Sequence, residues 1–230
     1  FASGNAQEGL KEFAERGQLS VMDTPKEAKN KLMDDWSKQG IEKPSENLIL
    51  VGTNIEATDL NEKAQQRRFS AEKLGKDSVA IGSERAFEGD RIMFSRNSRD
   101  YGVRNGQLAT VENVDVAKNR LKARLDNGQQ VNINLEDYNH IKLGYAVTTH
   151  KSQGMTAKNS FILAGGSMQD REMSYVQVSR AKGKTQIYTD KIEAGDNLTS
   201  LSRQMSKSRQ KDLATDVLTK VIRQEMPILR

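Results

Sequence analysis

The chain has 230 residues, of which 35% are hydrophobic and 29% are charged, so it is long enough for one large domain or two small ones. It has no cysteine, which excludes disulfides and thiolate metal sites, and no apolar run approaches the ~20 residues of a membrane span. The net charge of +5 permits a polyanionic partner, although a solvated basic protein has the same balance. We expect a cytoplasmic protein without membrane insertion.

Residues 1–44 are predicted to form linking helices. The opening FASGNAQEGLKEF is polar and helix-like, so we expect no secretory leader. A second helix is predicted after Thr24, because Thr24 is a good N-cap, Pro25 suits the first helical position and Glu27 completes a capping box. Gly40 is expected to end that helix.

Residues 45–81 have the pattern of an opening α/β domain. The run NLILVGTN is short, continuous and apolar, which is typical of a strand buried on both faces of a parallel sheet. A helix-like segment follows it, and ligands of such domains gather at the carboxyl ends of strands. Thr53 and Asn54, which end this strand, are therefore candidate ligand-binding residues, or they simply cap the following helix.

Between residues 82 and 140 the pattern changes to short β-rich runs. Asp126-Asn127-Gly128 between two alternating segments is a strong hairpin signal, so we predict a small antiparallel barrel inserted within the α/β domain. Basic residues in this insert are consistent with a contact to DNA, in addition to the strand-end residues discussed below. The acidic residues interleaved with them are consistent with a solvated face instead. The basic residues are Arg91, Arg96, Arg99 and Arg104, and the acidic ones are Glu88, Asp90 and Asp100.

The α/β pattern returns over residues 141–195, with the strand-like runs SFILAGG and TQIYTD on either side of the helix-like QDREMSYVQVSRAK. Residues 196–230 are predicted to form a basic helical tail. Seven basic residues stand against three acidic ones over 200–230, so most of the excess charge lies there. The tail is interpreted as a solvated linker helix or as a binding arm.

An unbroken row of hydrogen-bonding side chains stands in TTHKSQG. Thr148 and Thr149 are short hydroxyl donors at a strand end, suited to phosphate oxygens, while His150 can donate to a phosphate or stack beneath a base and Lys151 adds charge. None of these contacts requires a particular base. Gly154 lets the backbone approach a ligand closely. We expect no metal site, because no second ligand lies at a plausible spacing from His150.

Four stretches together resemble one family. TTHKSQGMT resembles motif V of superfamily 1 helicases, especially the RecD-like superfamily 1B branch, and SYVQVSRAKGKTQIYTD resembles motif VI, with Ser179-Arg180-Ala181 as its centre. LILVGTNIEATDLNEKAQQRR resembles the start of the second motor domain. EGDRIMFSRNSRDYGVRNGQLATV resembles the SH3-like subdomain placed just before motif V. The similarity covers roughly residues 45–190 in the correct order, and it is strongest to conjugative relaxase-helicases of the TraI/TrwC kind.

The resemblance implies an α/β fold: a RecA-like parallel-sheet lobe at 45–81 and 141–195, with an inserted small antiparallel SH3-like β-barrel at 82–140. It implies the second motor lobe of an ATP-dependent 5′-3′ DNA helicase, within a parent protein that nicks, unwinds and transfers plasmid DNA. The implied partners are single-stranded DNA and the first RecA-like lobe of the same parent chain.

The resemblance also assigns residues to roles. Arg180 is the catalytic arginine that stabilises charge on the γ-phosphoryl group, and Tyr175 and Gln177 help to hold it. Gln153 and Gly154 stand at the nucleotide cleft beside Arg180. The implied DNA-binding residues are Thr53, Asn54, Thr148, Thr149, His150 and Lys151.

A phosphate-binding loop of the form G-x-x-x-x-G-K-[ST] is missing. Gly183-Lys184-Thr185 has Val178 where the first glycine belongs, and a helix precedes it instead of a strand. Gly75-Lys76 fails because Asp77 follows. We therefore expect ATP and Mg²⁺ to bind in the parent protein, with none bound by this segment alone, which should not hydrolyse ATP by itself.

A second hypothesis makes the chain a non-catalytic interaction module. Relaxase-helicases of this kind are exported through type IV secretion channels, and internal translocation signals are associated with their helicase-like regions. The chain would then be recognised by the coupling protein. Patchy apolar exposure on the insert, away from the motif V run, would favour this hypothesis. An unrelated DNA-binding barrel protein would leave motifs V and VI unexplained.

Overall fold

The computed structural model describes residues 6–208. Its helices are α1 (Ala6–Glu15), α2 (Pro25–Gly40), α3 (Asn54–Ser70), α4 (Arg171–Val178), α5 (Lys191–Ala194) and α6 (Thr199–Ser206), with short 3-10 turns at Pro44–Glu46 and Asp196–Leu198. The strands are β1 (Leu19–Met22), β2 (Asn47–Val51), β3 (Ser78–Ile81), β4 (Glu84–Phe87), β5 (Arg91–Phe94), β6 (Leu108–Asp115), β7 (Arg120–Leu125), β8 (Gln130–Asn134), β9 (Ile141–Leu143), β10 (Ala146–Thr148), β11 (Asn159–Leu163) and β12 (Thr185–Asp190). None of these helices is long and apolar enough to cross a membrane.

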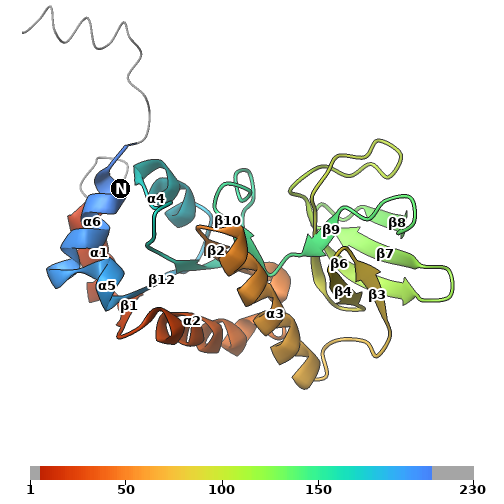
Figure 1. Cartoon of the computed structure of the whole chain (residues 1–230), viewed down its shortest axis with the longest axis horizontal. Coiled ribbons are helices and arrows are strands. Elements are labelled where there is room, and N and C mark those ends of the chain that lie inside the picture. The colour runs from red at the N-terminus through yellow and green to blue at the C-terminus, as the bar shows by residue number, and fades with distance from the viewer. Residues whose placement is uncertain (1–5, 209–230) are drawn as a thin grey trace, which may run out of the picture.

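A five-stranded parallel sheet in the order β1-β12-β11-β2-β10 forms the lobe (Figure 1). Every residue of β2 is buried, as its continuous apolar run predicts. Successive residues of the strand enter opposite cores, because side chains alternate across a sheet. Ile49 and Val51 pack with α2 and α3, whereas Leu48 and Leu50 share a cluster with residues of α1 and α6. The sheet is therefore covered on both faces.

Residues 78–143, which we call the insert, form a separate antiparallel unit (Figure 1). It contains the two-stranded sheet β3-β4 and the five-stranded sheet β8-β7-β6-β5-β9. The predicted hairpin joins β7 to β8 through Asp126-Asn127-Gly128, and Gly128 has the positive φ of 90° that this turn requires. The predicted α/β lobe with an antiparallel insert is confirmed, and its SH3-like character stays a prediction.

Several predicted boundaries move. The segment 1–44 is more than linking helices, because β1 adds a parallel strand to the sheet beside β12 and α2 packs on the same sheet. The insert is longer than the predicted 82–140. β3 and β9 lie just outside that range, but each pairs antiparallel with an insert strand and therefore belongs to the insert. In the predicted tail, α6 is helical and packs on α1 and α4, and residues 209–230 lie outside the described residues.

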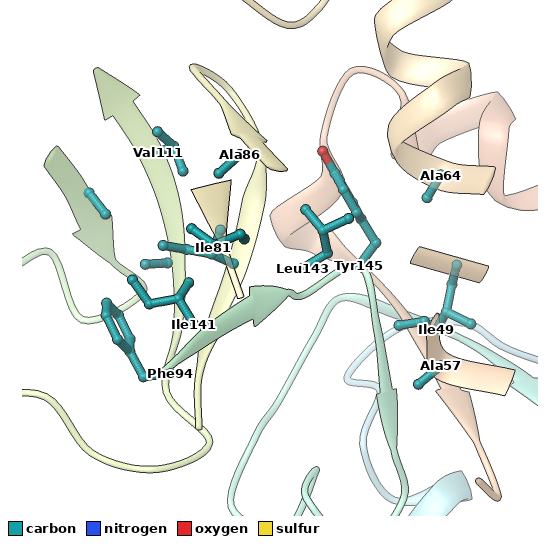
Figure 2. Packing of buried hydrophobic residues seen from close by; sticks show 14 of the residues in the cluster. Ile49, Ala57, Ala64, Ile81, Ala86, Phe94, Val111, Ile141, Leu143 and Tyr145 are labelled. Atoms are coloured by element: carbon teal, nitrogen blue, oxygen red, sulfur yellow. The ribbon is translucent and has the colours of Figure 1, made fainter. Parts of the chain in front are cut away.

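The insert meets the lobe at Tyr145, the buried residue just before β10, whose ring lies beside Leu143 of the insert (Figure 2). The Tyr145 hydroxyl donates to Asp90 and accepts from Arg68 at 3.1 Å, and Gln65 donates to the other oxygen of Asp90 at 2.6 Å. The backbone N–H of Tyr145 donates to the Asn61 side chain at 2.8 Å. Burial raises the pKa of Asp90 above its usual range. The chain thus enters β10 tied to both α3 and the insert.

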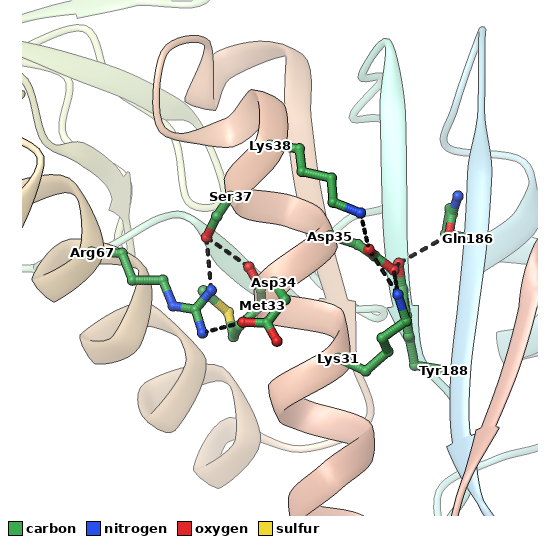
Figure 3. A network of polar contacts seen from close by, with 9 residues as sticks. All are labelled: Lys31, Met33, Asp34, Asp35, Ser37, Lys38, Arg67, Gln186 and Tyr188. Carbon is green, nitrogen blue, oxygen red and sulfur yellow. Dashed lines mark hydrogen bonds and ion pairs between the residues drawn. The ribbon is translucent and has the colours of Figure 1, made fainter.

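A second polar cluster ties α2 to the sheet. Asp35 accepts hydrogen bonds from Lys38 at 2.8 Å, from Lys31 at 3.0 Å and from the Tyr188 hydroxyl of β12 at 3.0 Å (Figure 3). Burial raises the pKa of Asp35, but these hydrogen bonds outweigh it, so the net pKa lies below the usual range. In the same view, Arg67 of α3 reaches back to Asp34, so the two helices are cross-linked over one face.

Candidate nucleic-acid interface

The row of polar residues after β10 divides into an inner and an outer set. Thr148 and Thr149 are buried, with 7% and 2% of their surface exposed. The Thr149 hydroxyl donates to the carbonyl of Val51 at 3.1 Å and accepts from Nε2 of Gln177 at 3.0 Å. The donor and one acceptor position of this hydroxyl are thus used inside the protein, which favours a structural role for Thr149, and its predicted DNA contact stays a prediction.

Gln177 extends that junction into the motif VI helix. It is 1% exposed, and its side-chain oxygen accepts from Gln169, which in turn donates to Ser174 at 2.6 Å. A continuous chain of hydrogen bonds therefore runs from the end of β2 through Thr149 to α4. These hydrogen bonds link Thr149 to the motif VI helix α4. Gln177 was predicted to support Arg180, but its side-chain hydrogen bonds go to Thr149 and Gln169 instead. Tyr175, predicted to share that supporting role, is 52% exposed.

Lys151 belongs to the outer set and faces Lys142 of β9. Burial lowers the pKa of Lys151, and the charge of Lys142 lowers it further. Both lysines line a small crevice with Asn54, Thr58 and Thr148. Glu84 also lines it: burial raises the pKa of Glu84, whereas a hydrogen bond from the backbone N–H of Leu143 and the charge of Lys142 lower it. Two adjacent ammonium groups without a close ion-pair partner in the described chain form a site suited to an anion.

Sequence reasoning missed Lys142. It stands between the buried residues Ile141 and Leu143, a pattern that indicates an exposed strand residue and nothing more. Its closeness to Lys151 arises only because β9 runs directly into β10 through Gly144 and Tyr145. Gly144 is required there, since a Cβ at this position would lie 2.8 Å from the backbone carbon of Ile92.

Of the two residues that follow β2, Thr53 has a structural role and Asn54 is exposed. Thr53 is the N-cap of α3: its hydroxyl accepts from the backbone N–H of Glu56 at 3.2 Å, and the Glu56 carboxylate accepts from the Thr53 N–H at 2.9 Å. The Thr53 side chain is therefore used in capping, which was the structural alternative. Asn54 is exposed beside the crevice of Lys142 and Lys151.

His150 and Gln153 are exposed on the loop that follows. Both line a hollow of ≈ 190 Å³ between this loop and α4, together with Met168 and Met173. Gly154 has a φ of 85°, and no atom lies within 4 Å of the place where a Cβ would stand. The backbone there is open to close approach by a ligand.

Arg180 lies against the same loop. Its guanidinium donates to the carbonyls of Ser152 and Met155 at 3.3 Å each and to the Ser179 hydroxyl at 2.9 Å. Its Nε donates to the carbonyl of Val176 at 3.1 Å. Arg180 therefore holds the loop that carries Gln153 and Gly154 through its two neighbouring carbonyls, and its role at a nucleotide cleft stays a prediction.

The arginines of the insert also differ from one another. Arg91 is 2% exposed and makes two 2.7 Å hydrogen bonds to the carboxylate of Asp126, so it is unavailable for a DNA contact. Arg96, Arg99 and Arg104 are exposed. Arg96 lies 3.3 Å from a ring nitrogen of His140. No described group of three or more His, Asp or Glu side chains is arranged to hold a metal ion.

Comparisons with known proteins agree with the motifs. No family model matches the chain. It is 30% identical over 194 residues to the conjugal transfer protein TraA of Rhizobium radiobacter, covering 82% of this chain and 17% of TraA. It is 29% identical over 151 residues to the multifunctional conjugation protein TraI of Escherichia coli, covering 62% of this chain and 8% of TraI. The chain thus spans less than a fifth of these relatives.

The fold has a solved counterpart. The Pif1 helicase from Bacteroides, in complex with ADP-AlF3 and single-stranded DNA, superposes with a TM-score of 0.51 at 17% identity, covering 88% of this chain and 51% of Pif1. This likeness concerns the fold alone. The chain is therefore homologous to the conjugation proteins TraA and TraI, over 82% and 62% of its length, and its RecA-like fold is shared with the matched part of Pif1.

Proposed function

We propose that the chain is the second motor lobe of an ATP-dependent 5′-3′ DNA helicase within a conjugative relaxase, and that it contacts single-stranded DNA. The observation that carries the proposal is the pair Lys142 and Lys151, which converges beside Asn54 and Thr148 at the carboxyl ends of β2 and β10. Two close positive charges repel each other, and a phosphate between them would turn this repulsion into attraction. Such contacts carry no sequence preference, as a translocating motor requires.

The relatives' names support this proposal. TraA and TraI are conjugation proteins, and the matched Pif1 structure holds single-stranded DNA. The 5′-3′ polarity rests on the family resemblance alone.

For ATP, this lobe would contribute Arg180, Gln153 and Gly154. The open backbone at Gly154 suits close approach by a phosphate oxygen, and the 3.3 Å bonds of Arg180 to two carbonyls are long enough to exchange for a stronger anionic acceptor. The bound nucleotide would supply the energy of translocation. The remaining ATP and Mg²⁺ contacts would come from the first lobe of the parent chain, since this sequence carries no phosphate-binding loop.

Recognition by a type IV coupling protein has weaker support. That hypothesis predicts apolar patches on the insert, but among the large apolar side chains exposed in the described residues only Val116 belongs to it. The others lie on the lobe, at Val21, Ile55, Phe69, Met168, Tyr175 and Ile192.

The test is a titration of the chain with fluorescent single-stranded DNA at low and moderate salt, beside an ATPase assay. We expect salt-sensitive binding without turnover. Absence of binding would refute the DNA contact. In the parent protein, Arg180→Ala should abolish most ATPase turnover and leave single-strand binding largely intact, and equal loss of both would show that Arg180 has been misplaced.

A further inference from the structure

A pocket of ≈ 300 Å³ lies between α2 and the sheet, at the amino ends of β11 and β12. Its lining includes Asn159, the first residue of β11, and Lys184, which directly precedes β12. The strands of this sheet are parallel, so the pocket is at the edge opposite the carboxyl ends of β2 and β10, where the candidate nucleic-acid interface lies. We call it the amino-edge pocket.

Positive charge exceeds negative charge in the amino-edge pocket. Three ammonium groups, of Lys31, Lys38 and Lys184, stand against the carboxylate of Asp35. Lys31 and Lys38 donate to the same oxygen of Asp35, at 3.0 and 2.8 Å, so their ammonium groups converge (Figure 3). Lys184 has no acidic partner within 4.0 Å among residues 6–208. The surplus of positive charge suits an anion with two negative charges.

Lys184 is placed at the pocket by Gly183-Lys184-Thr185, the turn that fails as a phosphate-binding loop. The N–H of Gly183 donates to the carbonyl of Lys158 at 2.8 Å, and a Cβ on Gly183 would lie 2.8 Å from that oxygen. The N–H of Lys184 donates to the Asn159 side chain at 3.3 Å. The backbone of Lys184 is therefore fixed between β11 and β12, and only its side chain has to be ordered when an anion binds.

Neutral donors supplement the ammonium groups. Because Asn159 accepts from Lys184 through its side-chain oxygen, its amide nitrogen is the donor to Gln39, at 3.1 Å. The Gln39 oxygen is the acceptor of that bond, so its own amide protons remain for a ligand. Ser20 adds a hydroxyl to the lining. A carboxylate presents two oxygens to these donors, whereas a phosphate monoester presents three terminal oxygens and two charges.

We propose that the amino-edge pocket binds the phosphate group of a phosphate monoester, with Lys31, Lys38 and Lys184 around its terminal oxygens. Each ammonium group has three N–H donors, so Lys31 and Lys38 can keep Asp35 and bind the phosphate together. Asp35 is a like charge beside the phosphate and limits its affinity. The inference goes beyond the proposed function, because none of the residues assigned there to DNA or ATP lines this pocket.

The test is an NMR titration of the isotope-labelled 230-residue chain with methyl phosphate, followed through the backbone amide signals of residues 184–186. Lys184→Ala should weaken binding about fivefold, the effect of losing one exposed ion pair. Lys182→Ala is the matched control, because it removes the same charge from a nearby exposed position outside the pocket, and it should bind like wild type.

Asp35→Asn should have the opposite effect. The change removes the like charge beside the phosphate and keeps an oxygen that can accept from the Tyr188 hydroxyl, so methyl phosphate should bind more tightly than to wild type. If Asp35 served only to hold α2 on the sheet, its loss would not strengthen anion binding.

The pH dependence gives a third readout. A phosphate monoester gains its second charge with a pKa of about 6, so the affinity of wild type should rise up to about tenfold between about pH 5 and about pH 7.5. Sulfate is doubly charged throughout, so its affinity should stay constant. No histidine of the described chain lines the pocket. Burial raises the pKa of Asp35, but its hydrogen bonds outweigh burial and leave the net pKa below the usual range, so Asp35 stays ionised.

Three results would overturn the inference. They are an absence of shifts at residues 184–186, equal binding by Lys184→Ala and Lys182→Ala, and binding of succinate as tight as that of methyl phosphate. Each of them would leave the proposed function unchanged, since that function is tested with single-stranded DNA at the opposite edge of the sheet.

Discussion

Two polar stretches of the molecule, Thr148–Gln153 in the lobe and Arg91–Arg104 in the insert, have the same internal division. In each, one residue that resembles a ligand-binding group is buried and fully paired, namely Thr149 with Val51 and Gln177, and Arg91 with Asp126. In each, a later basic residue is accessible to solvent: Lys151, which is half-buried, in the lobe and Arg104, which is exposed, in the insert. A polar side chain near a site therefore contributes by shaping it or by touching the ligand, and the two roles require different partners.

The largest expected effect on stability comes from removing the partner of Arg91, the buried arginine of the insert. Asp126→Ala leaves the Arg91 guanidinium, 2% exposed, without its carboxylate. Because Asp126 itself is 49% exposed, we expect a loss of about 2 kcal/mol in the free energy of unfolding, less than for a pair buried on both sides. Asp115→Ala, which breaks the exposed pair with Lys118, is the control and should cost less than about 1 kcal/mol. Urea denaturation measures both. Equal small losses would mean that Arg91 is hydrated in solution.

A change at Thr149, the buried residue of the lobe stretch, should have an intermediate effect on stability. Thr149→Val keeps the shape of the side chain but removes the acceptor of Gln177, so we expect a loss of about 1–2 kcal/mol in the free energy of unfolding. Affinity for single-stranded DNA, measured well below the melting temperature, should change less than it does in Lys151→Ala. A Thr149→Val variant of normal stability with strongly weakened DNA binding would restore Thr149 to the DNA contacts.

A smaller effect concerns Asp90, the buried carboxylate beside Arg91. Burial raises its pKa, so its protonated form is favoured by folding; that contribution is fully present below the ordinary pKa of Asp and is lost as the pH rises through the raised value. Asp90→Asn lacks this titration. The free energy of unfolding of wild type minus that of the variant should therefore fall as the pH rises above the ordinary pKa of Asp. A difference that increases with pH would contradict the raised pKa.

The local signals of the sequence predicted the local structure well. The capping box of Thr24 and Glu27 is present at the start of α2, and the apolar run of β2 is a buried central strand. β1 was missed because its four residues, LSVM, are mostly half-buried and carry no strong period. Its only strand partner, β12, comes from the other end of the described chain, so pairing creates this strand rather than local preference.

The candidate site was predictable as a location but not as a set of contacts. The row after β10 identified the correct strand end, because carboxyl ends of parallel strands collect ligands. Which members face outward depends on partners distant in sequence: Gln177 draws Thr149 inward, and Glu56 occupies Thr53. Lys142 joins the site only through the path of the chain from β9 to β10, which no local pattern describes.

In the function proposed above, the outer lysines Lys142 and Lys151 hold single-stranded DNA, and the inner Thr149 does not. The most direct test measures the affinity of wild type, Lys142→Ala, Lys151→Ala and Lys118→Ala for one fluorescent oligothymidylate over a range of salt. We expect each of the first two variants to lose roughly tenfold in affinity and about 0.7 in salt slope. Lys118→Ala, which changes an exposed lysine of the insert, should bind like wild type. Equal small losses in all three would mean that binding reflects net charge, and the site would be refuted.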